Sequence, residues 1–121
     1  MKKILIIEDQ KMLRDEVCDW FIFEGFETYN AANGQEGLLQ AKLHLPDLIL
    51  CDIMMPEMDG YAVLSNLRQT PETSKIPFLF MTAMADHQQV ANGMRAGADD
   101  YITKPFTRLD LLNAVNARLK K

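Results

Sequence analysis

The sequence predicts a doubly wound α/β domain, a three-layer sandwich in which helices cover both faces of a parallel five-stranded sheet. Five short apolar runs alternate with five amphipathic segments of helical period, and the connections between them are short. The apolar runs are continuous rather than alternating, as is typical of strands that are buried on both faces. The length of 121 residues suits one domain with one core, so we expect residues 1–121 to form a single unit.

The first strand and helix follow directly from this pattern. Ile4–Ile7 is a β-branched and leucine run that ends in Glu8 and Asp9. A helix is predicted over 11–24, and Gly25 stands where a C-terminal cap belongs. Four apolar side chains fall on one face of this helix: Leu13, Val17, Trp20 and Phe21.

The second unit is less apolar. Residues 27–32 alternate weakly and predict a short strand near a sheet edge. Asn33, with Glu36 three residues later, predicts the start of a helix by a capping box. Pro46 ends this helix, and its expected inward side chains are Leu38, Ala41 and Leu45.

The third unit starts with Leu48–Cys51, an apolar run that ends abruptly at Asp52. After the Pro56–Gly60 loop, a helix with Leu64 and Leu67 facing the core is expected to end before Thr70–Pro71. The chain is then expected to resume as a strand at Lys75–Pro77 and to continue through the apolar run that ends at Thr82.

The last part of the chain repeats the pattern twice. A helix over 86–96 is expected to use Val90 and Met94 as its apolar pair, and Gly93 in its middle makes it the softest helix, because glycine costs about 1 kcal/mol relative to alanine there. A strand over 101–103 follows. The final helix starts at 107 or 108 and is expected to turn Leu109, Leu112 and Leu119 inward.

Composition excludes several classes of function. The formal net charge is −4 and no basic cluster is longer than Lys120–Lys121, so we expect no direct binding of nucleic acid. Ile4–Ile7 is too short for a signal peptide, and no apolar run approaches the roughly 18 residues of a membrane span. Cys18 and Cys51 fall in predicted buried elements and are expected to be reduced thiols. These features predict a cytoplasmic protein without membrane contact.

Polar residues follow the strands at the point where each strand ends. In a parallel sheet these ends share one edge, so Glu8, Asp9, Asp52, Thr82 and Lys104 are expected to meet in one crevice. Three carboxylates repel one another unless protons or a cation neutralise them, and a hard divalent ion such as Mg²⁺ suits oxygen ligands. The alternatives are a solvated acidic rim, and an Asp52 that only caps a turn before Pro56.

A lysine and a threonine at the same edge of the sheet could bind a phosphate group. Lys104 supplies a positive charge for phosphate oxygens, and the Thr82 hydroxyl can donate to one of them. Asp52, at the end of the central strand, is the best candidate for a nucleophile that forms an aspartyl phosphate. His44, placed within a helix, and His87, at the start of one, are interpreted as surface histidines.

Five motifs in this order resemble the receiver domain of two-component response regulators, over essentially the entire chain. They are Glu8-Asp9, Asp52 with Met55-Pro56 and Asp59-Gly60, Thr82-Ala83, Gly97 through Tyr101, and Lys104-Pro105-Phe106. The resemblance implies a flavodoxin-like fold with strand order 2-1-3-4-5. It also implies a phosphorylation-controlled switch rather than an enzyme, acting in phosphorelay signal transduction.

The resemblance further implies a role for each site residue. Asp52 would accept a phosphoryl group from the phosphohistidine of a sensor histidine kinase or phosphotransfer protein. Mg²⁺ (or Mn²⁺) would be held by Asp9, Asp52 and the backbone carbonyl of Met54, with Glu8 holding metal-bound waters. Lys104 would contact the phosphoryl group and be joined to Pro105 by a cis peptide bond.

The resemblance also implies a switch. Thr82 would move toward the phosphoryl group and Tyr101 would change rotamer, which would rearrange the face formed by the helix over 86–96, the strand over 101–103 and the last helix. Mixed charges along this face suit a symmetric dimer that controls an output partner or domain, although a solvated face is the simpler explanation of these charges. These charges are Arg95, Asp99, Asp100, Arg108 and Asp110.

Two features depart from the commonest pattern of the family. The acid pair begins with Glu8 rather than aspartate, which lengthens one arm of the metal site. Met54 and Met84 are bulky and apolar at positions that, in this family, flank the path of the hydrolytic water. We therefore expect slow self-dephosphorylation.

Two other classes of function remain as alternatives. An Mg²⁺-dependent phosphatase or phosphotransferase with an aspartyl-phosphate intermediate usually needs a second acid near the nucleophile, but the residue two positions after Asp52 is Met54. A nucleotide or flavin binder would need glycines or hydroxyls in the loop after the first strand, where residues 8–11 are Glu-Asp-Gln-Lys. The output, and whether the chain acts alone or within a longer protein, stay open.

Overall fold

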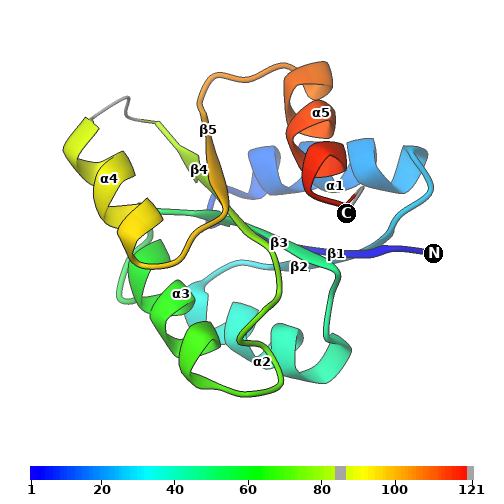
Figure 1. The fold of residues 1–121 in the computed structure, drawn as a ribbon. Helices are drawn as coiled ribbons and strands as arrows, with labels where there is room; N and C mark the ends of the chain where they lie inside the picture. The colour runs from blue at the N-terminus through cyan, green and yellow to red at the C-terminus, as the bar shows by residue number, and fades with distance from the viewer. Residues whose placement is uncertain (84–86, 120–121) are drawn as a thin grey trace.

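The computed structural model describes residues 1–83 and 87–119, and it contains a parallel sheet of five strands in the order β2-β1-β3-β4-β5 (Figure 1). Neighbouring strands pair in parallel, so their carboxyl ends lie along one edge. This confirms the doubly wound fold and the predicted strand order. The strands are β1 (Lys3–Ile7), β2 (Glu27–Ala31), β3 (Leu48–Asp52), β4 (Phe78–Thr82) and β5 (Asp100–Thr103).

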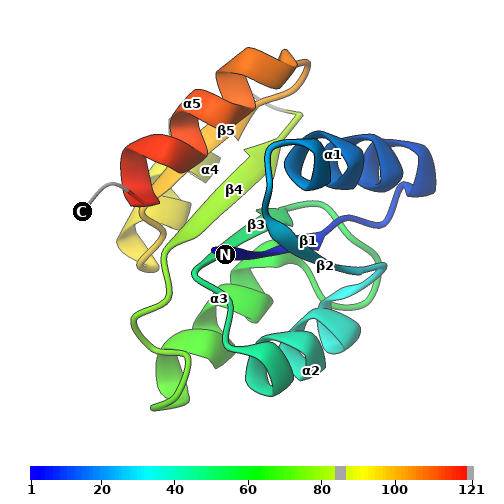
Figure 2. The ribbon, with the colours of Figure 1, turned by 90° about the vertical axis from the view of Figure 1, so that its right-hand side faces the viewer.

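Helices cover both faces of this sheet (Figures 1 and 2). The helices α1 (Lys11–Phe23) and α5 (Arg108–Leu119) pack on one face, and α2 (Gly34–His44) and α3 (Gly60–Gln69) pack on the other. The remaining helix, α4 (His87–Arg95), lies on the side of α3, where Gly93 approaches the rings of Phe80 and Tyr61. The result is the expected three-layer arrangement.

The core is divided between the two faces because successive strand side chains point to opposite sides. In β1, for example, Leu5 and Ile7 pack toward α2 and α3, whereas Ile4 and Ile6 pack toward α1 and α5. Every residue of β3 and β4 is buried. These two strands therefore fix the backbone positions of their last residues, Asp52 and Thr82.

Local signals set the ends of the helices where the sequence predicts them. Gly25 adopts a φ of +92°, and its N–H donates to Ile22 O (3.0 Å), which closes α1. The Asn33 side chain accepts from the Glu36 N–H (2.8 Å) and caps α2. Asp59 caps α3 in the same way, because its carboxylate accepts from the Ala62 N–H (2.9 Å).

Several predicted inward side chains are exposed. Leu45 has left-handed backbone geometry at the end of α2 and is 50% exposed, because the residue before Pro46 is kept out of the helix. Leu109 (65%) and Met94 (42%) are also exposed. In α5 the predicted Leu112 is buried, together with Leu111 and Val115. The Val90 side chain lies outside what the structure describes.

Two further boundaries differ from the prediction. Lys75–Pro77 belongs to the loop before β4, which begins at Phe78, because the Ile76 N–H donates to Thr73 O (3.3 Å) in a turn and Pro77 has no N–H to donate. His44 is the last residue of α2 rather than a residue within the helix, and its ring stacks on Tyr29.

Arg68, near the C-terminal end of α3, holds together the segments beside β4. Its guanidinium donates to the backbone carbonyls of Gly97 (2.9 Å), Ile76 (2.7 Å) and Ser74 (3.2 Å). It also forms an ion pair with Asp99 (3.3 Å). One side chain thereby fixes the chain segments that enter β4 and β5.

Two simpler predictions concern the cysteines and the membrane. Cys18 and Cys51 are both buried free thiols, as expected, and burial raises the pKa of Cys18 to about 11. None of the helices within residues 1–83 and 87–119 has the length and apolar character of a transmembrane segment.

Candidate functional site

Three carboxylates meet at the carboxyl edge of the sheet. Glu8 and Asp9 directly follow β1, Asp52 is the last residue of β3, and β1 and β3 are neighbours in register from Ile4 with Leu48. One oxygen atom from each of the three carboxylates lies within 4.8 Å of the others. The predicted convergence of these acids is therefore present.

Lys104 lies between two of these acids. Its Nζ atom is 2.9 Å from Glu8 Oε1 and 3.4 Å from Asp52 Oδ2. The backbone N–H of Lys104 donates to Thr82 O (2.7 Å), so the lysine follows directly from the pairing of β4 with β5. The peptide bond between Lys104 and Pro105 is cis, in agreement with the expectation.

Burial sets the electrostatics of the site. The Glu8 side chain is fully buried and Asp52 is 6% exposed, and this loss of water raises the pKa of both carboxyl groups. The Lys104 ammonium lowers both pKa values without cancelling the effect of burial, and the Met54 N–H also favours the ionised form of Asp52. The carboxylates thus carry a charge that the protein alone does not fully compensate.

The donor set fits a hard divalent cation. All three groups offer carboxylate oxygens, which Mg²⁺ and Mn²⁺ prefer, and a second positive charge beside Lys104 would relieve the repulsion between them. Glu8 already uses both oxygens, one for Lys104 and one for the Gln10 N–H (3.1 Å). This leaves Asp9 and Asp52 better placed than Glu8 for direct coordination.

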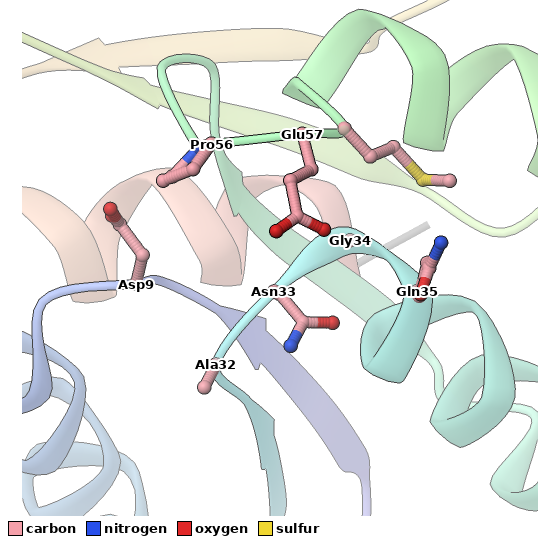
Figure 3. A pocket seen from close by; sticks show the side chains of 8 residues that line it. Asp9, Ala32, Asn33, Gly34, Gln35, Pro56 and Glu57 are labelled. Atoms are coloured by element: carbon pink, nitrogen blue, oxygen red, sulfur yellow. The ribbon is translucent and has the colours of Figure 1, made fainter.

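The site opens to solvent beside Asp9 (Figure 3). The hollow there is formed by the loops after β1, β2 and β3, and the carboxylate of Asp9 points into it. Glu57, which has a positive φ of 70°, extends its carboxylate over the same hollow. An ion or a small phosphate compound can therefore reach the acids from this side.

A second hollow flanks Lys104. Its walls include Leu13 and Trp20 from α1 and Phe106 from the loop after β5, and the rings of Trp20 and Phe106 meet edge to face with centroids 6.3 Å apart. Ala83 and Lys104 form the end of this hollow that is nearest the acids. This hollow therefore offers apolar surface beside Lys104 and the acids that Lys104 contacts.

The two predicted switch residues lie on neighbouring strands. Thr82 is the last residue of β4, is 1% exposed and pairs with Thr103 of β5. Tyr101 of β5 is 40% exposed, so its ring lies toward solvent in this structure. Their movement stays a prediction. Met54 is 61% exposed beside the site, and Met84 lies outside the described residues.

Residues that the sequence did not single out support the acids and the neighbouring face. Arg14 of α1 donates to the Glu8 carbonyl (2.8 Å) and so fixes the loop that carries Glu8 and Asp9. On the face of α4, β5 and α5, Arg118 lies 3.9 Å from Asp100. Arginine positions in amphipathic helices are usually solvated, so the sequence alone offered no signal for either contact.

Several charges expected to serve a dimer are already bound within the chain. Asp99 pairs with Arg68, and Arg108 pairs with Glu24 (2.7 Å) and lies over the Phe23 ring (4.9 Å). Asp110 accepts from the Thr107 N–H (3.2 Å) at the start of α5. These charges therefore have structural roles before any partner is present.

Fold and site together define a doubly wound α/β domain with a centre of three carboxylates and one lysine at the carboxyl edge of its sheet. The family model for the response regulator receiver domain matches residues 4–116. The chain belongs to this family, whose members act in two-component, phosphorelay signal transduction.

Individual relatives agree with this assignment. The chain is 38% identical to the DNA-binding dual master transcriptional regulator RpaA of Synechocystis and 40% identical to the transcriptional regulatory protein CiaR of Streptococcus pneumoniae, in each case over all of this chain. It covers 50% and 53% of these proteins, so the chain spans about half the length of these curated relatives. Among solved structures, chemotaxis protein CheY4 of Vibrio cholerae superposes with a TM-score of 0.95 at 28% identity, covering 98% of this chain and 99% of that one.

Proposed function

We propose that residues 1–121 form one receiver domain that accepts a phosphoryl group on Asp52 and uses it to change the surface of α4, β5 and α5. The observation that carries this proposal is the position of the Asp52 carboxylate, which is buried at the sheet edge, 3.4 Å from the Lys104 ammonium and beside Glu8 and Asp9. The donor is the phosphohistidine of a sensor histidine kinase or a phosphotransfer protein.

The chemistry at Asp52 is a transfer from nitrogen to oxygen. A carboxylate oxygen of Asp52 attacks phosphorus, the N–P bond of the phosphohistidine breaks, and the imidazole keeps its electron pair. Lys104 neutralises charge on the phosphoryl oxygens, as its present contact with Asp52 supports. Thr82 donates its hydroxyl to one of the same oxygens after transfer.

Asp9, Asp52 and the Met54 carbonyl are the residues that would hold Mg²⁺ or Mn²⁺, with Glu8 binding metal-bound waters. When bound, the ion supplies positive charge that stabilises the transferring phosphoryl group. The cluster of acids, with its raised carboxyl pKa values, supports this assignment. Arg14 and the Gln10 N–H keep Glu8 in place while the other acids act.

The signal leaves the site through Thr82 and Tyr101. Movement of the Thr82 hydroxyl toward the phosphoryl group frees space on the β4 side, and Tyr101, which faces solvent here, turns inward to fill it. The changed face contacts an output partner or domain, or a second copy of the chain. We place this exchange in the cytoplasm, where sensor kinases present their phosphohistidine.

The decisive test is covalent incorporation of phosphate. Acetyl phosphate with Mg²⁺ is expected to load one phosphate per chain, in a form that hydroxylamine releases, and Asp52→Asn is expected to load none. Unchanged loading of Asp52→Asn would refute the assignment of the acceptor. Repeated turnover of a generic phosphate ester would instead favour the phosphatase or phosphotransferase alternative.

Sedimentation tests the switch and the proposed dimer together. Beryllofluoride with Mg²⁺ mimics the phosphoryl group, and it is expected to shift the wild-type chain toward a dimer but to leave Asp52→Asn unchanged. A matched control is Asp47→Asn, which changes a carboxylate far from the site that accepts from the Lys3 N–H.

A further inference from the structure

The helix α2 buries small residues and exposes two of its leucines, which is the reverse of the usual arrangement in a surface helix. Its buried residues are the small ones, Gly34, Gly37 and Ala41. Two of its three leucines, Leu39 and Leu43, are instead 68% and 73% exposed. They stand four residues apart and therefore share one face of the helix.

The inner side of α2 explains the small residues but not the exposed leucines. A Cβ atom at Gly37 would lie 2.5 Å from Ile7 Cδ1, so the helix backbone packs directly on β1. Nothing on the outer side requires apolar side chains, because polar residues there would keep the helix equally well formed. Two large exposed apolar side chains next to each other on one helix face offer a contact surface to another protein.

Charges of opposite sign flank Leu39 symmetrically. Glu36 precedes it by three residues and Lys42 follows it by three, and both are exposed. Neither side chain forms an ion pair with any residue that the structure describes. We call the surface formed by Glu36, Leu39, Lys42 and Leu43 the α2 face.

We propose that the α2 face binds the α2 face of a second copy of this chain. In an antiparallel arrangement with a two-fold axis at Leu39, each Glu36 stands at the level of the partner copy's Lys42, which gives two equivalent ion pairs. The two Leu39 side chains meet at the centre, and each Leu43 adds apolar contact beside them. The self-complementary order of charge, leucine and charge selects a second copy over an unrelated partner.

This contact is separate from the proposed α4, β5 and α5 face and does not depend on phosphorylation of Asp52. One helix face buries less than the roughly 1,200 Å² of a stable complex, so the association is weak and transient for isolated chains. It becomes effective when copies are concentrated by a common partner or by another interface.

A disulfide at the two-fold axis tests the arrangement directly. Leu39→Cys places two thiols opposite each other, whereas the native Cys18 and Cys51 are buried. Under mild oxidation at high protein concentration, Leu39→Cys is expected to form a covalent dimer about tenfold faster than Met12→Cys, an exposed control on α1. Equal rates for the two variants would overturn the proposal.

Variants with reversed charges show whether the crosslink comes from this specific contact or from random collisions. In the Leu39→Cys background, Lys42→Glu places like charges together twice and is expected to slow crosslinking about tenfold. Adding Glu36→Lys restores opposite charges and is expected to restore the rate. A double reversal that crosslinks as slowly as Lys42→Glu alone would refute the pairing, and a chemical denaturation curve for each variant verifies that it is folded. Because Asp52 is untouched, phosphate loading by these variants tests the proposed function independently.

Discussion

Lys104 and Glu8 form an ion pair of 2.9 Å, in which the glutamate is fully buried and the lysine is partly exposed. The lysine is thus closer to Glu8 than to Asp52, from which it is 3.4 Å away. The long arm of glutamate makes this contact possible while the Glu8 backbone stays bound to Ala31 and Arg14. Glu8 and Asp52 therefore share the only lysine in the described cluster, and Glu8 is the nearer of the two.

Without the Lys104 charge, the buried Glu8 carboxylate should destabilise the fold. Lys104→Met is expected to lower the free energy of unfolding by about 3 kcal/mol in EDTA, because a buried carboxylate loses its partner. Glu8→Gln in the same background should recover most of this loss. Urea denaturation measures both, and additive effects of the two substitutions would contradict the pairing.

The pH dependence of stability follows from the raised carboxyl pKa values of Glu8 and Asp52. Below the usual values of 4.5 and 3.8, both groups are protonated in the folded and unfolded chain, and the stability linked to them is fully present. As the pH rises through the raised values, the folded chain must ionise buried groups and this stability is lost.

The urea midpoint of the metal-free protein should therefore fall as the pH rises above the usual carboxyl range, and Mg²⁺ should restore it at the higher pH. Asp52→Asn should flatten the profile because it removes one of the two groups. A midpoint that rises with pH in EDTA would contradict the assignment of the raised pKa values.

Met54 is expected to lengthen the lifetime of the phosphoryl group. Its side chain is 61% exposed beside Asp52 and offers no hydrogen bond to an incoming water molecule. Met54→Asn should shorten the lifetime severalfold, as measured by loss of radioactive phosphate from the loaded protein. Met12→Asn changes an exposed methionine on α1 and should leave the lifetime unchanged; equal lifetimes for both variants would contradict this role.

Gly93 sets the distance between α4 and the sheet. A Cβ atom at this position would lie 2.8 Å from the Phe80 ring, so Gly93→Ala should destabilise the fold by about 1 kcal/mol even though alanine favours helix. Phe80→Leu makes room and should reduce the penalty when combined with it. Chemical denaturation of the single and double variants tests this, and a stabilised Gly93→Ala would show that α4 adjusts freely.

The sequence predicted the strands and the convergence of the acids because both follow from simple periodicity and from parallel topology. Leu48–Cys51 could only be buried on both faces, and its end therefore fixed the place of Asp52. The contact between Lys104 and Glu8 was not predicted, because the reach of a side chain depends on the distance between two strand ends rather than on either segment.

Helix faces were predicted less well than strands. In α5, Leu109 and Leu111 stand two residues apart. Apolar residues three or four positions further on follow each of them, so the sequence pattern alone does not show which leucine faces the core. The structure selects Leu111, because it completes the buried row with Val115. For α2, the predicted inward positions of Leu38 and Ala41 are confirmed, because Leu38 packs against the core and Ala41 is buried, whereas Leu45 is exposed.

Arg68 restricts how α4 can move. The C-terminal end of this helix is tied to the sheet through the Gly97 carbonyl and Asp99, both bound by the arginine, and through the Asp99 N–H, which donates to Phe78 O (2.8 Å). A displacement of α4 that keeps these bonds leaves its C-terminal end in place, so the N-terminal end of the helix would move further than the C-terminal end. Loss of the Arg68 guanidinium would free the C-terminal end as well, and the whole helix could then shift.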